Sequence, residues 1–236
     1  MAFMGQRTSP KLCQICEEKE GGIINKAILI MGESGSGKTT SLRNLPPGET
    51  YYIDCDKRGL SWKGWREQYN SQKKNYKATD LPEVVSSIIS GIDQKCPHIK
   101  YIVVDTLNGI MVGNEMRRIK EKGYDKWSEL AQSIWGLVDG AYTYRDDLTL
   151  IFTAHCQTER DEFGYVFTRM KTNGRKLEKV QVESKFTTVL LAKADKEGYF
   201  FLTRDPASTC KTPLGAFESD KIENDIMLVI RSLQKY

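Results

Sequence analysis

The sequence contains no apolar run approaching the length of a membrane span, which takes about 20 consecutive hydrophobic residues. The first residues, MAFMGQRTSPKLC, also lack the apolar core of a signal peptide. We therefore expect a protein of the cytoplasm that has no membrane partner.

Residues that commonly bind zinc are few and scattered. The chain has two histidines, His98 and His155, and among its six cysteines only Cys13 and Cys16 form a C-x-x-C pair. A structural zinc site normally needs a second such pair or closely spaced histidines. The pattern favours reduced thiols without metal, and it leaves a metal role for the one pair open.

The excess of one charge sign is also small, since the net charge is +4. Such a bias permits a nucleic-acid partner without requiring one. With 236 residues, of which 39% are hydrophobic and 28% charged, the chain has the composition of a soluble globular protein. It is long enough for one α/β domain with a complete core.

One motif is present in full, at residues 28–40. Here the apolar segment ILIM runs into GESGSGKTT, which fits the phosphate-loop pattern G-x-x-x-x-G-K-[ST]. Chance would produce this pattern in about one chain in a hundred of this length, and a flexible linker would need neither the strand nor the Lys-Thr-Thr. The glycines let backbone N–H groups surround phosphate oxygens, and a helix beginning near Lys38 would add its positive end.

The motif predicts binding of ATP with Mg²⁺. Lys38 would reach the β and γ phosphates, and the Thr39 hydroxyl would bind the metal ion. The residues of the predicted nucleotide-binding loop are Gly32, Glu33, Ser34, Gly35, Ser36, Gly37, Lys38, Thr39 and Thr40.

Strand and helix patterns alternate after this loop. Strands are expected over 26–31, 50–55, 101–105 and 148–155, and a hairpin over 186–194 and 198–204. Helices are expected over 38–44, from Pro82 with Asp80 as N-cap, across 109–143 with a break at Lys122-Gly123, and over 219–233, whereas 157–185 is polar and rich in charge. The pattern predicts an α/β domain over 26–236, with a mostly parallel sheet flanked by helices and a C-terminal β-hairpin, after an N-terminal extension over 1–25.

Polar residues stand where the predicted parallel strands end, which is where such sheets bind ligands. Asp105 ends YIVVD and would hold Mg²⁺. Asp54 and Asp56 stand at the end of the second strand. Asp56, which lies past the strand end, would orient or deprotonate water, although a solvated turn explains it nearly as well. His155 ends LTLIFTAH and could distinguish ATP from ADP, unless it is an ordinary hydrogen-bonded histidine.

The ordered segments GESGSGKTT, YIDCD, YIVVD and IFTAH resemble the core of the RecA-like recombination ATPases over roughly residues 26–232. This resemblance implies a P-loop NTPase in which Asp56 is the catalytic carboxylate, Asp105 the Mg²⁺ ligand and His155 the γ-phosphate sensor. The segment TCKTPLGAF resembles the one whose lysine reaches the nucleotide of a neighbouring subunit, so Lys211 would act in trans within a homo-oligomer. The short chain looks most like the small phage-encoded members of the family, and its cytoplasm would then be that of the host.

Three departures from the family pattern matter. The catalytic acid is Asp rather than Glu, so its shorter reach predicts slow hydrolysis. The sensor is His where RecA usually has Gln. An obvious N-terminal polymerisation helix is lacking, which puts filament formation in doubt.

The resemblance implies single-stranded DNA as a partner, held by segments after the Mg²⁺ strand and the sensor strand. The first carries Arg117, Arg118, Lys120 and Lys122, and the second Arg160, Arg169, Lys171, Arg175, Lys176 and Lys179. Basic charge follows phosphates and aromatic faces stack on bases. The aromatic residues Phe163, Tyr165 and Phe167 alternate in the second segment, and one buried strand face would explain them as well.

The expected function is a DNA-dependent ATPase of recombination or annealing, with Lys38, Asp56, His155 and Lys211 as catalytic residues. A single-strand-binding protein is a further expected partner. Two alternatives remain: a nucleotide or small-molecule kinase, in which 157–179 would act as a basic lid, and a nucleotide-gated binding module that barely hydrolyses ATP.

Overall fold

The computed structural model describes residues 26–123, 125–173 and 179–236. The expected N-terminal extension over 1–25, with Cys13 and Cys16, lies outside these ranges, as do Arg175 and Lys176 of the second basic segment. Among the described residues, no helix combines the length and the apolar character needed to cross a bilayer.

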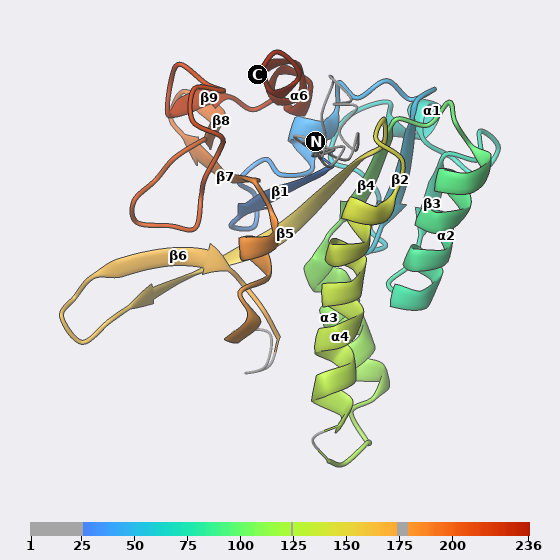
Figure 1. Ribbon diagram of the computed structural model, residues 1–236, viewed down its shortest axis with the longest axis horizontal. Coiled ribbons are helices and arrows are strands. Elements are labelled where there is room, and N and C mark those ends of the chain that lie inside the picture. The colour runs from blue at the N-terminus through green and yellow to red at the C-terminus, as the bar shows by residue number, and fades with distance from the viewer. Residues whose placement is uncertain (1–25, 124, 174–178) are drawn as a thin grey trace, which may run out of the picture.

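A twisted sheet forms the centre of the molecule, with strands in the order β3-β2-β4-β5-β1-β7-β8-β9 (Figure 1). The strands are β1 (Ala27–Gly32), β2 (Thr50–Asp54), β3 (Tyr76–Ala78), β4 (Tyr101–Asp105), β5 (Thr149–Arg160), β6 (Val166–Met170), β7 (Thr188–Asp195), β8 (Gly198–Leu202) and β9 (Lys221–Glu223). Neighbours from β3 to β7 pair in parallel, whereas β7, β8 and β9 pair antiparallel. The mostly parallel sheet with a C-terminal hairpin is therefore confirmed.

Helices cover both faces of this sheet. They are α1 (Trp65–Gln68), α2 (Pro82–Lys95), α3 (Leu107–Arg117), α4 (Asp125–Gly140) and α6 (Ile226–Gln234), with short 3-10 turns η1 (Thr40–Leu42), η2 (Ala141–Thr143) and η3 (Val182–Lys185). Two of the helices begin at capping side chains, because Thr106 accepts a hydrogen bond from the Gly109 N–H and Asp225 one from the Met227 N–H.

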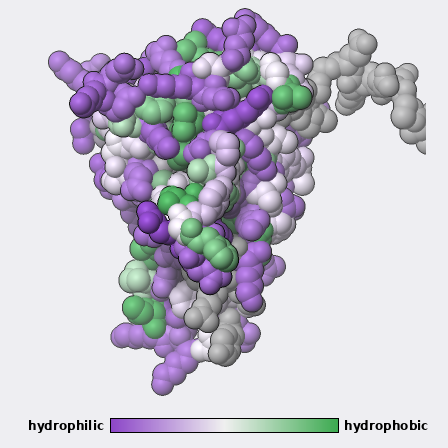
Figure 2. Space-filling model, turned by 90° about the vertical axis from the view of Figure 1, so that its left-hand side faces the viewer, coloured by the Kyte–Doolittle hydropathy of each residue, from purple (hydrophilic) through white to green (hydrophobic). Residues whose placement is uncertain are grey.

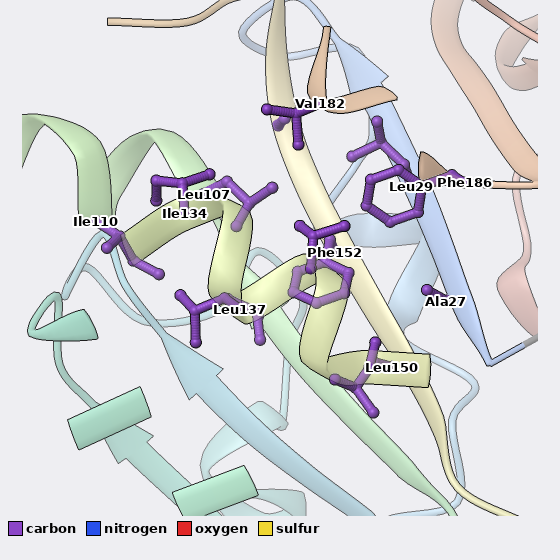
Figure 3. Close-up of a cluster of buried hydrophobic side chains, with 14 of the residues drawn as sticks. Ala27, Leu29, Leu107, Ile110, Ile134, Leu137, Leu150, Phe152, Val182 and Phe186 are labelled. Atoms are coloured by element: carbon purple, nitrogen blue, oxygen red, sulfur yellow. The ribbon is translucent and has the colours of Figure 1, made fainter. Parts of the chain in front are cut away.

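The core has two layers because successive side chains of a strand point to opposite faces. In β1, Leu29 and Met31 join a cluster under α2, α3 and α4, whereas Ile28 and Ile30 join one with α6. Figure 3 shows part of the first cluster, in which Phe152 and Phe186 lie against β1 and the helices contribute Leu107, Ile110, Ile134 and Leu137. Strands buried on both faces explain the continuous apolar runs of the sequence.

Three helix predictions are wrong. The α-helix expected over 38–44 is only the 3-10 turn η1, where the Ser41 hydroxyl donates to the Lys38 carbonyl at 2.6 Å and competes with helical bonding. Asp80 does not cap α2, because it forms ion pairs with Lys57 and Arg117 instead. The final helix does not begin at 219, since Lys221–Glu223 pairs with β8 as strand β9.

The polar segment expected over 157–185 contains a strand pair. The end of β5, Cys156–Arg160, continues beyond the central sheet and pairs antiparallel with β6, and Figure 1 shows this hairpin projecting from the body of the molecule. The buried strand face offered for the aromatic residues is wrong for Phe163 and Tyr165, which are 89% and 53% exposed.

Candidate nucleotide-binding site

The phosphate loop lies at the carboxyl end of β1, between β5 and β7. Gly32 stands opposite His155 on one side and Ala192 on the other. Lys38 folds back under the loop, and its Nζ donates to the carbonyl oxygens of Gly32 at 2.9 Å and Glu33 at 2.7 Å. Burial lowers the pKa of Lys38, while the nearby Asp105 carboxylate opposes this shift.

Most of the predicted loop residues line one cavity, whereas Gly32, Glu33 and Ser36 do not. A cavity of about 450 Å³ is lined by Ser34, Gly35, Gly37, Lys38, Thr39 and Thr40, together with residues from other segments. Gly32 is buried and Glu33 is exposed. The hydroxyl of the buried Ser36 has no hydrogen-bond partner among the described residues. The cavity is thus lined by the glycine-rich loop that the motif predicts to surround phosphates.

Thr39 and Asp105, which are far apart in the sequence, are in contact. The Thr39 hydroxyl donates to Asp105 Oδ2 at 2.9 Å, and the Tyr52 hydroxyl donates to the same oxygen at 2.6 Å. Thr153 donates to Asp105 Oδ1. Three hydroxyl groups thus fix the orientation of a carboxylate that is 5% exposed.

This donor set fits Mg²⁺. The ion prefers oxygen ligands, and beside a nucleotide it typically takes one or two protein side chains, phosphates and waters. Thr39 and Asp105 offer one hydroxyl and one carboxylate at the end of the phosphate loop. Within the described ranges, no group of three or more His, Cys, Asp and Glu side chains is placed to hold a metal ion by itself.

The two aspartates at the end of β2 have different surroundings. Asp54 is buried and accepts hydrogen bonds from the backbone N–H groups of Lys57 and Gly59 and from the Tyr76 hydroxyl, so it shapes the turn. Asp56 is partly exposed; Thr106 donates to its Oδ1 at 3.0 Å, and Arg58 Nη2 lies 3.0 Å from its Oδ2.

His155 lies between two cavities. It lines the cavity of the phosphate loop and a second one of about 330 Å³, which Asp56, Asn108 and Gly109 also line. Burial, followed by the positive charge of Lys38, lowers the pKa of His155 below its ordinary value of 6.5. A neutral imidazole at this position can donate or accept a hydrogen bond.

The structure adds residues that the sequence did not single out. Arg58 and Ser61 line the phosphate-loop cavity, and the Ser61 hydroxyl lies 2.9 Å from that of Thr40. Tyr199 of β8 lines it too, and a Cβ at Gly37 would stand 2.8 Å from the Tyr199 ring. Spacing offered no signal for Tyr199, because a hairpin brings it to the loop across more than half of the chain.

The C-terminal segment also touches the phosphate-loop region. Arg43 Nη1 donates to the Asn224 carbonyl at 2.8 Å, and Asn44 Nδ2 donates to Asp225 Oδ2 at 2.7 Å. These bonds hold β9 and α6 against the turn that follows the loop.

Lys211 stands apart from this site. Its backbone pairs with Val189, which lies beside Leu29, three residues before Gly32. Its side chain is exposed, and among the described residues it is not one of those lining either cavity.

Several of the basic residues expected to bind DNA are engaged in ion pairs. Arg117 pairs with Asp80, Arg118 with Glu121 and Glu129, and Arg169 with Glu159. Lys120, Lys122, Arg160, Lys171 and Lys179 are exposed.

The loop after β1 and the sheet behind it define the class of the protein, which is that of the P-loop nucleoside triphosphatases. The chain belongs to the family described as AAA domain, whose model matches residues 24–214. It is a RecA-like P-loop ATPase by fold, with nucleotide binding and hydrolysis as the general activity of the class.

Among solved structures, the chain is similar to the KaiC-like protein PH0186 from the hyperthermophilic archaeon Pyrococcus horikoshii OT3, with 14% identity, a TM-score of 0.44, and coverage of 78% of this chain and 80% of that one. A search of the curated proteins found no match.

Proposed function

We propose that this protein binds ATP with Mg²⁺ and hydrolyses it slowly, with single-stranded DNA as the activator. Its role would be in DNA recombination or annealing of the kind that small phage-encoded RecA-like ATPases perform, as a homo-oligomer in the host cytoplasm and together with a single-strand-binding protein. The observation that carries this proposal is strand β5, which bears His155 at the nucleotide site and continues directly into the projecting hairpin.

On the nucleotide side, each group has a physical task. Lys38, released from the Gly32 and Glu33 carbonyls, would bind the phosphates through its ammonium group. Thr39 and Asp105 would hold Mg²⁺, which when bound neutralises charge on the β and γ phosphates. Asp56 would accept a proton from the attacking water.

On the hairpin, two aromatic rings face solvent. Phe163 at the tip is 89% exposed and Tyr165 is 53% exposed, and the Tyr165 and Phe167 rings stack with centroids 6.3 Å apart. Figure 2, which looks onto this end of the molecule, shows apolar surface in green among mostly hydrophilic surface. Exposed rings on a polar hairpin suit unpaired bases, which stack without sequence preference.

The hairpin and the nucleotide site share hydrogen bonds. Asn108 at the start of α3 accepts from the His155 N–H at 2.7 Å and donates to the Lys171 carbonyl at 2.9 Å. The Lys171 N–H in turn donates to the His155 carbonyl at 2.7 Å. A shift of His155 on γ-phosphate binding would therefore reach the base of the hairpin.

One observation favours a second candidate, a nucleotide-gated module that barely hydrolyses ATP. Thr106 and Arg58 hold one oxygen each of Asp56, so the proposed base has partners on both sides. The kinase alternative receives no such support, because the hairpin projects from the body and does not fold over the phosphate loop (Figure 1).

The test is ATP turnover with and without single-stranded DNA, with analysis of all phosphorylated products. We expect slow turnover to ADP and phosphate that DNA accelerates, and none in Lys38→Ala. Replacing Phe163 and Tyr165 together by Ala should weaken DNA binding by about 1–3 kcal/mol per stacked base lost and remove the stimulation, while turnover without DNA persists.

Tyr236→Ala is the matched control, because Tyr236 is also 55% exposed but lies at the far C-terminus. Equal stimulation in the double variant and in wild type would contradict DNA binding by the hairpin. Binding of ATP without turnover would favour the gated module, and a phosphorylated acceptor would favour the kinase.

A further inference from the structure

Arg58 is a second cation beside the phosphate loop. It follows β2 in the turn that Asp54 organises, and its side chain is 60% exposed. It lines the same cavity as Lys38, Thr39 and His155. Its guanidinium lies 3.0 Å from Asp56 Oδ2.

Arg58 adds a second positive charge to the lining of the phosphate-loop cavity. Its positive charge is one of the smaller influences that lower the pKa of His155, after burial and Lys38. Lys38 and Arg58 thus place two positive charges around one cavity of about 450 Å³. A triphosphate would be the natural anion to balance them.

The ion pair between Arg58 and Asp56 can be exchanged at little cost. The Arg58 side chain is 60% exposed and that of Asp56 18%, and ion pairs that water reaches contribute only roughly 0–1 kcal/mol to stability. A guanidinium also binds phosphate oxygens with two parallel hydrogen bonds, and it keeps its charge at every physiological pH. A γ-phosphate entering the cavity is therefore a strong competitor for Arg58.

We propose that Arg58 is a further catalytic residue. When ATP enters, the Arg58 guanidinium moves from Asp56 to the γ-phosphate, and the Asp56 carboxylate is then free to act as the base. The inference rests on the ATP-hydrolysing function proposed above. With ADP no γ-phosphate is present, and Arg58 stays on Asp56.

Hydrolysis then proceeds with Asp56 Oδ2 free. The water oxygen forms a bond to the γ-phosphorus as the bond from that phosphorus to the β–γ bridging oxygen breaks, giving ADP and inorganic phosphate. The proton of the water passes to Asp56. Arg58 stabilises the charge that develops on the γ-phosphate oxygens, while Thr106 holds the other oxygen of Asp56 in place.

The experiment compares Arg58→Ala and Arg58→Lys with wild type in the full chain. Affinities for ADP and for a non-hydrolysable ATP analogue are measured with Mg²⁺, together with turnover. For Arg58→Ala we expect ADP affinity within about twofold of wild type, about tenfold weaker binding of the analogue, and turnover lower by about 10²-fold, the loss typical of one removed transition-state donor. Arg58→Lys should restore part of the analogue affinity.

Arg66→Ala is the matched control, because Arg66 is an exposed arginine nearby whose guanidinium lies over the Trp65 ring, 4.6 Å from its centroid, outside the cavity. It should behave as wild type. Thermal unfolding of each variant separates a folding defect from a loss of binding.

The outcomes separate this inference from the proposed function. Wild type that binds the analogue without hydrolysing it contradicts the hydrolytic function, and the ratio of analogue to ADP affinity in Arg58→Ala still decides the role of Arg58. The inference is overturned if this ratio is unchanged, whether both affinities stay the same or both fall equally. In Asp56→Asn, the ratio of analogue to ADP affinity should stay high, because Arg58 remains free to bind the γ-phosphate. A ratio that falls as in Arg58→Ala would mean that Arg58 acts only through Asp56, and this result would also overturn the inference.

Discussion

At the scale of single residues, the site is built around a buried carboxylate. Asp105 accepts hydrogen bonds from Thr39, Tyr52 and Thr153, which come from the phosphate loop and from the two strands beside β4. A buried charge is costly unless its oxygens are hydrogen-bonded. The three hydroxyl groups offset this cost and hold the carboxylate in one orientation.

His155 yields a prediction about protons. Its pKa is lowered by burial and by Lys38, with smaller contributions from Arg58 and Lys171, whereas Asp56 raises it. Phosphate anions in the cavity would raise the pKa again, so nucleotide binding near pH 6 should be accompanied by proton uptake. Calorimetry in two buffers with different ionisation enthalpies measures this uptake. Proton uptake of the same size in His155→Gln would assign it to another group.

The same lowered pKa affects stability in a known direction. The unfolded chain binds a proton on His155 near pH 6.5, and the folded chain binds it only at lower pH. The contribution of His155 to stability is therefore fully present above pH 6.5. It is lost as the pH falls from 6.5 through the lower pKa of the folded chain.

At the scale of elements, the strands that are buried on both faces of the sheet are the ones that the sequence predicted best. The central strands could be predicted because each is a short, continuous apolar run, as in β4 (Tyr101–Asp105). Strand β6 could not, since only Met170 of Val166–Met170 is buried, so the segment has no buried apolar face to mark it as a strand. Strand β9 has three residues, and only its pairing with β8 defines it.

In the candidate site, too, some residues could be placed from the sequence and others could not. The loop, Asp105 and His155 could be placed from sequence because each stands at the end of a recognisable strand. Arg58 and Tyr199 could not be, because their positions depend on a turn bonded to Asp54 and on a distant hairpin. The functional roles of all these residues stay predictions.

Helix α3 and strand β5 yield a prediction through Asn108. Asn108→Ala removes the acceptor of the His155 N–H and the donor to Lys171. Because the residue is 6% exposed, we expect a loss of about 1–3 kcal/mol in the free energy of unfolding. DNA stimulation of turnover should fall more than turnover without DNA. Denaturant unfolding and the stimulation ratio measure the two effects.

Asn173→Ala is the control for this prediction. Asn173 also connects the segment after β6 to α3, through Glu115 at 2.9 Å, but makes no bond to His155. An equal fall in the stimulation ratio in both variants would contradict a specific role for the Asn108 bonds.

At the scale of the whole molecule, Lys211 and the phosphate loop lie at different levels of the sheet. Lys211 pairs with Val189 beside the middle of β1, whereas the loop follows the end of β1 at Gly32. Lys211 is thus an exposed cation outside the lining of its own phosphate-loop cavity. The trans role of Lys211 remains a prediction of the family resemblance.

Mixing experiments test that role. Lys211→Ala retains an intact phosphate loop, and Lys38→Ala retains Lys211, so neither variant should turn over ATP alone, whereas their mixture should recover activity. Turnover should also rise steeply with protein concentration. Lys196→Ala, an exposed lysine of the β7–β8 turn, should be fully active. Full activity of Lys211→Ala alone, or no recovery on mixing, would rule out the trans role.

The hairpin of β5 and β6 has a consequence for how this protein can change. Its tip is shaped largely from within, since Asp161 accepts from the N–H groups of Phe163 and Tyr165, and its own N–H donates to the Tyr165 carbonyl. Such a surface loop tolerates replacement far better than the sheet that supports it. The tip is thus a natural grafting point, where a new binding sequence could be installed while the nucleotide machinery at the other end of β5 is inherited unchanged.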